Sequence, residues 1–155
     1  MWGGRHVLDV SVFERKGLIL TDLHGTIYSH RQDKIRDGLL EFLKYYKERN
    51  KKIALRSAGP SEEELESISR KHGFRDFLDG FFGDEAIIPA PGDDFLYSRV
   101  DLKRIAEKMG FSVEQAIHID EGGWASSGWF YGVDTVVVPE IADHPEFSFR
   151  SLIPN

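Results

Sequence analysis

Two short acidic segments, each placed directly after an apolar run, contain the residue types best suited to chemistry in this sequence. Asp22 follows the run that begins at Leu18, and the pair Asp120-Glu121 follows the run that begins at Ala116. Carboxylates at such positions can bind hard cations, attack an electrophile or transfer protons. In an open α/β sheet, ligands bind at the carboxyl ends of the strands. The two segments therefore predict one site built from both.

The elements that must position these acids alternate between short apolar runs and amphipathic stretches. Strands are expected over residues 18–22, 52–57, 86–89, 115–119 and 132–139. Helices are expected over residues 35–46, 61–72 and 100–109, with one short helix over 125–131. The helix at 61–72 opens with Ser61 and Glu64 in the spacing of a capping box. This alternation predicts an α/β fold with three layers, a Rossmann-like and mainly parallel sheet with helices on both faces.

The segments outside this alternation are less regular. Residues 5–13 alternate imperfectly between polar and apolar side chains, so an extra edge strand is expected within residues 1–16. Polar loops are expected over 28–33 and 89–94, and residues 140–155 are expected to form a C-terminal tail. No domain boundary is visible, and a single domain over all 155 residues is expected.

Composition limits the class of protein. The chain is 41% hydrophobic and 30% charged, which is typical of a soluble globular protein. It has no cysteine, which excludes disulfides, thiolate zinc sites and cysteine nucleophiles. The formal charge of −6 argues against general nucleic-acid binding, although nucleic acid stays open as a substrate. No apolar run is long enough to span a membrane and no signal-peptide core is present, so no membrane partner and a cytoplasmic location are expected.

Three apolar runs lead into polar or acidic residues, at 21–27, at Ser57 and at Asp120-Glu121. The first of these segments, Thr-Asp-Leu-His-Gly-Thr-Ile at 21–27, resembles the first signature of the haloacid dehalogenase superfamily of phosphohydrolases, an Asp-x-Asp-Gly-Thr after a hydrophobic strand. The apolar run that ends in Ser57 resembles the second motif, and the run that ends in Asp120-Glu121 resembles the fourth. Each motif is short, and their order along residues 17–139 is the stronger signal.

The resemblance implies a magnesium-dependent phosphohydrolase in which Asp22 attacks phosphorus and forms an aspartyl-phosphate. Magnesium suits such a site because it prefers oxygen ligands and binds through few carboxylates plus phosphate. Its protein ligands would be Asp22, the backbone carbonyl of His24, and Asp120 or Glu121. The hydroxyl of Ser57 would donate a hydrogen bond to the transferring phosphoryl group.

A basic residue would complete the charge balance around the phosphoryl group. The family's lysine is expected at the start of the helix before the fourth motif, which points to Arg99, with Lys103 one turn further on. Arginine binds phosphate through two parallel hydrogen bonds, so it is a tolerable replacement for lysine. Either side chain could equally lie on a solvated helix face.

His24 stands where most phosphatases of this family have their second aspartate. An imidazole can protonate a leaving group and activate water near neutral pH. The same replacement is compatible with a second hypothesis, a catalytically degenerate member that binds a metal or a phosphorylated partner without turnover. A response-regulator-like receiver fits less well, because receivers place their acid pair after the first strand.

The spacing of the motifs bears on substrate size. Asp22 and Ser57 are 35 positions apart, and Ser57 and Arg99 are 42 apart, which leaves no room for the cap domain of many relatives. By resemblance to capless members, the site would be open and would be closed by homo-oligomerisation or by a large substrate. Those members include phosphatases of proteins, sugar phosphates and nucleic-acid ends, so the expected partner is a phosphorylated substrate.

Overall fold

The computed structural model describes residues 9–83, 87–88, 99–122 and 131–155. A five-stranded sheet with the order β5-β4-β1-β8-β9 lies at its centre. The strands are β1 (Leu18–Asp22), β4 (Lys52–Arg56), β5 (Gly80–Phe82), β8 (Ala116–Asp120) and β9 (Asp134–Val137). Every pairing within this sheet is parallel. The expected mainly parallel α/β sheet is therefore confirmed.

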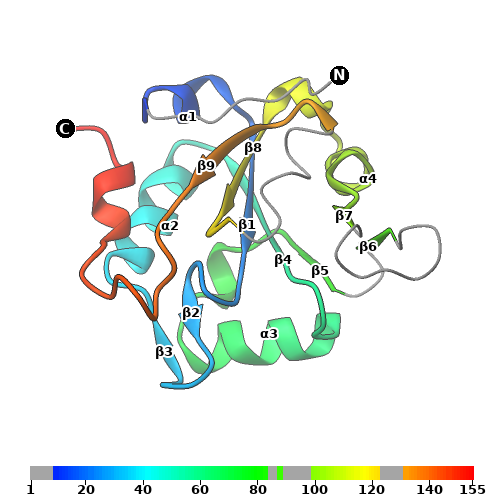
Figure 1. The fold of residues 1–155 in the computed structure, drawn as a ribbon. Coiled ribbons are helices and arrows are strands. Elements are labelled where there is room, and N and C mark those ends of the chain that lie inside the picture. The colour runs from blue at the N-terminus through cyan, green and yellow to red at the C-terminus, as the bar shows by residue number, and fades with distance from the viewer. Residues whose placement is uncertain (1–8, 84–86, 89–98, 123–130) are drawn as a thin grey trace.

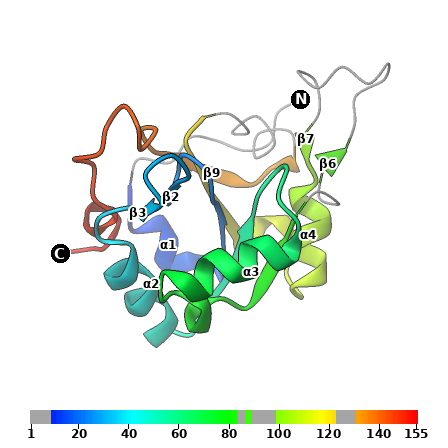
Figure 2. The ribbon, with the colours of Figure 1, turned by 90° about the horizontal axis from the view of Figure 1, so that it is seen from below.

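Helices cover both faces of the sheet, as Figures 1 and 2 show for α2 and α4 on opposite sides of the strands. The α-helices are α1 (Val12–Arg15), α2 (Leu39–Glu48), α3 (Glu62–Lys71) and α4 (Leu102–Lys108). Short 3-10 helices are η1 (Arg75–Phe77), η4 (Val113–Gln115) and η5 (Phe149–Leu152). Because the strands are buried on both faces, they read as nearly continuous apolar runs. None of the described helices is long and apolar enough to span a membrane.

The three central strands, β4, β1 and β8, contribute residues to two apolar clusters, one on each face of the sheet. Ile19 and Ile117 belong to the cluster that includes the buried side chains of α1, α2 and α3. Leu20 and Ala54 belong to the cluster under α4. Asp22 is two positions beyond Leu20 in the same strand and therefore points to the α4 side of the sheet.

The edge strand expected within residues 1–16 is wrong for the part that the structure describes, because Val12–Arg15 forms α1. The turn before it is fixed by Asp9, whose side chain accepts a hydrogen bond from the backbone nitrogen of Ser11 at 2.9 Å. Phe13 is then fully buried against two aromatic rings of α2. The helical turn α1 therefore buries the Phe13 ring in the core and adds no strand to the sheet.

The segment after β1 is more regular than the expected polar loop over 28–33. It forms a two-stranded antiparallel hairpin of β2 (Tyr28–Ser29) and β3 (Lys34–Ile35). The following helix begins at Leu39 and not at residue 35, because Gly38 has a φ of 78°. The helix expected over 61–72 is confirmed as α3, with the Ser61 side chain capping its first turn.

The strand expected over 86–89 is partly wrong. The edge strand of the main sheet next to β4 is β5, which contains two phenylalanines. Residues 87–88 instead form β6 (Ile87–Ile88), which pairs antiparallel with β7 (Arg99–Val100) in a separate small sheet. The loop expected over 89–94 and the helix expected over 125–131 lie outside the described residues.

The C-terminal segment is not the tail that was expected over 140–155. Phe149 and Leu152 of η5 are buried in the cluster beneath α2. The ring of Phe149 lies 5.2 Å from that of Phe42, and the hydroxyl of Tyr46 donates a hydrogen bond to the carbonyl of Leu152 at 2.7 Å. This segment therefore completes the core on the α2 side of the sheet.

Replacing Phe149 with alanine should lower the free energy of unfolding by about 3 to 5 kcal/mol, because the change leaves a cavity in a fully buried aromatic cluster. Urea denaturation followed by circular dichroism measures this loss. The control is Leu40→Ala on α2, where the side chain is 39% exposed and the loss should stay below about 1 kcal/mol. An equal, small effect of both changes would contradict a packed C-terminal segment.

Candidate active site

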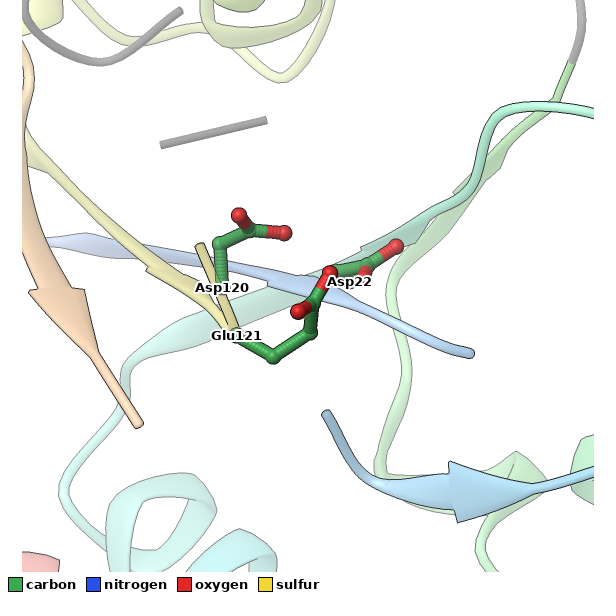
Figure 3. Close-up of side chains that lie close together, drawn as sticks. All are labelled: Asp22, Asp120 and Glu121. Carbon is green, nitrogen blue, oxygen red and sulfur yellow. The ribbon is translucent and has the colours of Figure 1, made fainter. Parts of the chain in front are cut away.

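The carboxyl ends of three adjacent strands bring four charged side chains together. Asp22 ends β1, Arg56 ends β4 and Asp120 ends β8, with Glu121 directly after it. One oxygen from each of the three acids lies within 4.8 Å of the others. Figure 3 shows these carboxylates converging from two neighbouring strands. The two acidic segments singled out in the sequence therefore do meet.

Asp22 is held from two sides and is 4% exposed. Its Oδ2 accepts a hydrogen bond from the Thr26 hydroxyl at 3.1 Å, and its Oδ1 lies 3.4 Å from Nη1 of Arg56. Burial raises the pKa of Asp22 to about 7, Arg56 acts to lower this pKa, and the nearby Asp120 acts to raise it. A carboxylate in this position is poorly solvated, and the cation beside it favours its charged form.

Asp120 and Glu121 supply the remaining oxygen donors. Asp120 is fully buried, and its Oδ1 accepts a hydrogen bond from Nη2 of Arg56 at 2.9 Å. Its Oδ2 accepts a hydrogen bond from the backbone nitrogen of Gly122 at 2.9 Å. A set of carboxylate oxygens suits a hard cation such as Mg²⁺ better than a soft one. The residues that are present therefore fit a magnesium ion.

Arg56 is the residue of this site that the sequence pattern did not single out. It lies directly before Ser57. Its charged side chain is fully buried at the end of an otherwise apolar stretch of β4. A charged residue within an apolar strand, in register with Asp22, was the available signal. Such a residue is rarely fully buried unless it is paired.

His118 completes the surroundings of Arg56. Its Nε2 accepts a hydrogen bond from Nε of Arg56 at 3.1 Å, so the ring proton lies on Nδ1. That Nδ1 atom has no hydrogen-bond partner among the residues the structure describes. Burial, and then Arg56, lower the pKa of His118 to about 3, and the imidazole is neutral near pH 7. His118 is thus a buried sheet residue with a polar contact to Arg56.

The three residues expected to bind phosphate, Ser57, Arg99 and Lys103, lie in different parts of the fold. Ser57 follows β4 and is buried at the carboxyl end of the sheet, where its backbone nitrogen bonds to the carbonyl of Phe82 at 3.0 Å. Arg99 lies in β7 and not at a helix start, since α4 begins at Leu102, and its side chain is outside the described part. Lys103 lies on the exposed face of α4.

His24 is half-buried beside the hairpin. Its ring centroid lies 5.8 Å from that of Tyr28 and 5.7 Å from that of His30. Burial is the largest cause that lowers the pKa of His24, the second is repulsion by His30, and Glu64 acts in the opposite direction. The imidazole is therefore mainly neutral near pH 7 and able to accept a proton.

A cleft of about 450 Å³ opens next to His24. It is bounded by the turn after β1, the hairpin and the segment after β9, and its lining includes His24, Tyr28, Arg31 and Glu140. A second cleft, of about 300 Å³, lies at the start of α2 and contains none of the expected site residues. The first cleft is therefore the space available to a substrate beside His24.

Gly25 sets how closely the turn after β1 approaches the acid pair Asp120 and Glu121. Its φ of 82° is in the left-handed region, which favours glycine. A Cβ at this position would lie 3.1 Å from Cγ of Glu121 and 3.1 Å from Oε1 of Glu140. Both the backbone conformation and the available space therefore require glycine between His24 and Thr26.

The hairpin that carries His30 is tied to the C-terminal end of α3 (Figure 1). Asp33, in the turn of the hairpin, accepts hydrogen bonds from Tyr28 at 2.6 Å and from His72 at 2.8 Å, and it also pairs with Lys71. These partners hold the pKa of Asp33 well below its usual range, with the Lys71 contact as the largest cause. The hairpin is thus fixed at its turn by one carboxylate.

No protein-family model matches the sequence, and no curated protein matches it. Solved structures are similar in fold. The chain resembles 4-nitrophenylphosphatase from Thermotoga maritima with a TM-score of 0.60 and 13% identity, over 83% of this chain and 88% of that chain. It resembles an uncharacterized protein from Listeria monocytogenes serotype 4b with a TM-score of 0.57 and 15% identity, over 83% and 94% of the two chains.

A third similar structure is a phosphoserine phosphatase, with a TM-score of 0.53 and 14% identity, over 86% of this chain and 99% of that chain. Likeness at this level of identity shows a shared fold. Because one fold hosts many activities, the function of this chain has to be argued from its own site.

The Asp33 contacts predict a pH dependence of stability. Because the folded-state pKa is below the unfolded value of about 3.9, the stabilisation is present above about pH 4 and is lost as pH falls through the folded pKa. Asp33→Asn should therefore lower the melting temperature at pH 6 and make it fall less steeply between about pH 5 and pH 2. Thermal unfolding over this range measures both effects. The exposed change Asp143→Asn should keep the wild-type profile, and parallel profiles for all three proteins would refute the assignment.

Proposed function

We propose that this chain is a magnesium-dependent phosphohydrolase that uses Asp22 as its nucleophile. The observation that carries the proposal is the convergence of Asp22, Asp120 and Glu121 at the carboxyl end of the sheet. The likeness in fold to solved phosphatases supports it, as does the resemblance of residues 21–27 to the first signature of the haloacid dehalogenase superfamily. A pure scaffold has no evident need for three clustered acids at the carboxyl end of a parallel sheet.

The metal would be held by Asp22, Asp120 or Glu121 and the backbone carbonyl of His24. When bound, Mg²⁺ would neutralise the negative charges of the nucleophile and of the phosphoryl group. Oxygen donors of this kind fit Mg²⁺, and at least two of them come from rigid strand ends. This arrangement is compatible with magnesium as the natural ion.

Asp22 would act in the first chemical step. A carboxylate oxygen of Asp22 forms a bond to phosphorus, and the bond from phosphorus to the leaving oxygen breaks. The contact with Thr26 fixes the orientation of the Asp22 carboxylate. In the second step, water attacks the phosphorus of the aspartyl-phosphate, and the Asp22 carboxylate and inorganic phosphate are released.

His24 would move the protons of both steps. The protonated imidazole gives its proton to the leaving oxygen, and the neutral imidazole then takes a proton from the attacking water. Because its pKa is lowered, the neutral form dominates near pH 7 and suits the second step. The cleft of about 450 Å³ beside this ring would receive the leaving group.

The phosphoryl group would be contacted by the Ser57 hydroxyl and by a basic residue, for which Arg99 and Lys103 stay candidates. Substrate would be a phosphorylated molecule that approaches an open site, either because it is large or because a second subunit encloses it. Ser57 and one of these basic residues would thus complete the set of groups around the phosphoryl group.

A second candidate is a degenerate relative that binds a metal or phosphorylated partner without turnover. The observation that favours it is the pairing of Arg56 with both Asp22 and Asp120, which partly satisfies these acids without any metal. His24 in place of an aspartate favours it as well. Binding of Mg²⁺ or phosphate by calorimetry, with no product over long incubation, would select this alternative.

Asp22→Asn should reduce turnover by at least about 10³-fold, because an amide oxygen is a poor nucleophile. The measurement is release of inorganic phosphate, with and without Mg²⁺, from phosphorylated small molecules, a phosphopeptide and a 3′-phosphorylated oligonucleotide. Asp143→Asn, which removes an exposed carboxylate, is the control and should keep wild-type rates. Equal turnover in wild type and Asp22→Asn would reject the mechanism.

His24→Ala should lower kcat by about 10² to 10⁴-fold with a much smaller change in KM, because proton transfer is lost while the charges that bind phosphate remain. The substrate is whichever member of the panel the wild type hydrolyses fastest. His144→Ala, at an exposed histidine, serves as the control. A His24→Ala variant with normal kcat would remove His24 from proton transfer.

A further inference from the structure

Arg56 is the one cation that the described part of the chain places among the catalytic acids. It is fully buried, and its guanidinium reaches from β4 across β1 to β8. Nη1 lies 3.4 Å from Oδ1 of Asp22, and Nη2 lies 2.9 Å from Oδ1 of Asp120. The same guanidinium therefore bridges the nucleophile and a proposed metal ligand.

The orientation of this guanidinium is fixed by a third contact. Nε of Arg56 donates to Nε2 of His118, which is itself fully buried in β8. Nη2 contacts the same imidazole nitrogen and also donates to Asp120, which leaves Nη1 facing Asp22. Guanidinium is planar and charged at all accessible pH values, so this contact positions a permanent charge.

We propose that Arg56 is a positioning residue that holds Asp22 and Asp120 together before a divalent ion binds, and that its charge weakens the binding of that ion. The inference rests on the magnesium binding in the proposed function. It goes beyond that function because it assigns control over metal affinity to a strand residue that lies outside the family's motifs. Arg56 thereby places a positive charge directly on the two aspartates, a role that the sequence pattern did not assign to it.

The electrostatics require both effects. Two carboxylates buried side by side repel one another, and a buried charge without a partner is strongly destabilising. The guanidinium relieves this repulsion in the absence of metal. It also occupies Oδ1 of each aspartate and adds one positive charge close to where a divalent ion would bind, so the ion meets a less negative site.

The two contacts differ in length, which indicates which one yields to a metal. The 2.9 Å contact to Asp120 is a charge-assisted hydrogen bond of ordinary length, whereas the 3.4 Å contact to Asp22 is long. The bonds to His118 and to Asp120 can therefore persist while the long contact of Asp22 Oδ1 with Arg56 is exchanged for the ion. Asp22 is the ligand whose availability Arg56 controls.

The test is the dissociation constant for Mg²⁺ of the full chain, measured by titration calorimetry, together with the melting temperature with and without Mg²⁺. Arg56→Met keeps an unbranched apolar stem and removes the guanidinium with its charge. Its Mg²⁺ dissociation constant should fall by at least about tenfold, which corresponds to about 1.4 kcal/mol. The metal-free variant should melt at a lower temperature than wild type, and the rise in melting temperature on adding Mg²⁺ should be larger.

Arg56→Lys keeps the charge and should bind Mg²⁺ within about threefold of wild type. The matched control is Arg150→Met, because Arg150 also bridges two carboxylates, with contacts of 2.7 Å to Asp37 and 2.8 Å to Glu41, and none of these residues is a proposed metal ligand. Its Mg²⁺ dissociation constant should be unchanged. If Arg56→Met does not fold, Arg56→Gln is the second neutral variant and carries the same expectation.

Unchanged or weaker Mg²⁺ binding in a folded neutral variant would overturn the inference, as would a failure of wild type and both neutral variants to bind Mg²⁺. Binding by the neutral variants alone would support it. The proposed function fails separately: if wild type hydrolyses no phosphate ester while Arg56→Met still binds Mg²⁺ more tightly, the role of Arg56 stands without phosphatase activity.

Discussion

Asp22, Arg56 and Asp120 lie side by side at the carboxyl end of the sheet, almost without exposure to solvent. Any one of these charges alone in that place would destabilise the fold by several kcal/mol. They are tolerated because the parallel order β4-β1-β8 puts their strands in one register, so that carboxylates and guanidinium meet. The chemistry of the site and the stability of the sheet therefore depend on the same contacts.

The two faces of the sheet divide the remaining tasks. The α2 side holds a large aromatic and aliphatic core, which the C-terminal segment completes. Arg36 connects this side to the site, since it donates hydrogen bonds to the carbonyls of Thr26 and Pro139 and lies 5.2 Å from the ring of Phe147. The turn after β1 and the segment after β9 are thus held together by one buried arginine.

The sequence predicted the strands that end in acids, because an apolar run followed by a carboxylate is readable without any tertiary information. Arg56 could not be assigned in this way, since its burial depends on a partner 64 positions away. The expected edge strand near residue 12 and the expected tail after residue 140 were wrong for a related reason. Both segments are short and become ordered by packing on α2, which local periodicity does not report.

Gly25 lies where the turn after β1 meets the segments after β8 and β9, which can approach it closely because it has no side chain. The hydrogen atom that takes the place of a side chain leaves room for Glu121 on one side and Glu140 on the other. A mutational scan scored by turnover would therefore mark this position as essential, although it contributes no reactive atom.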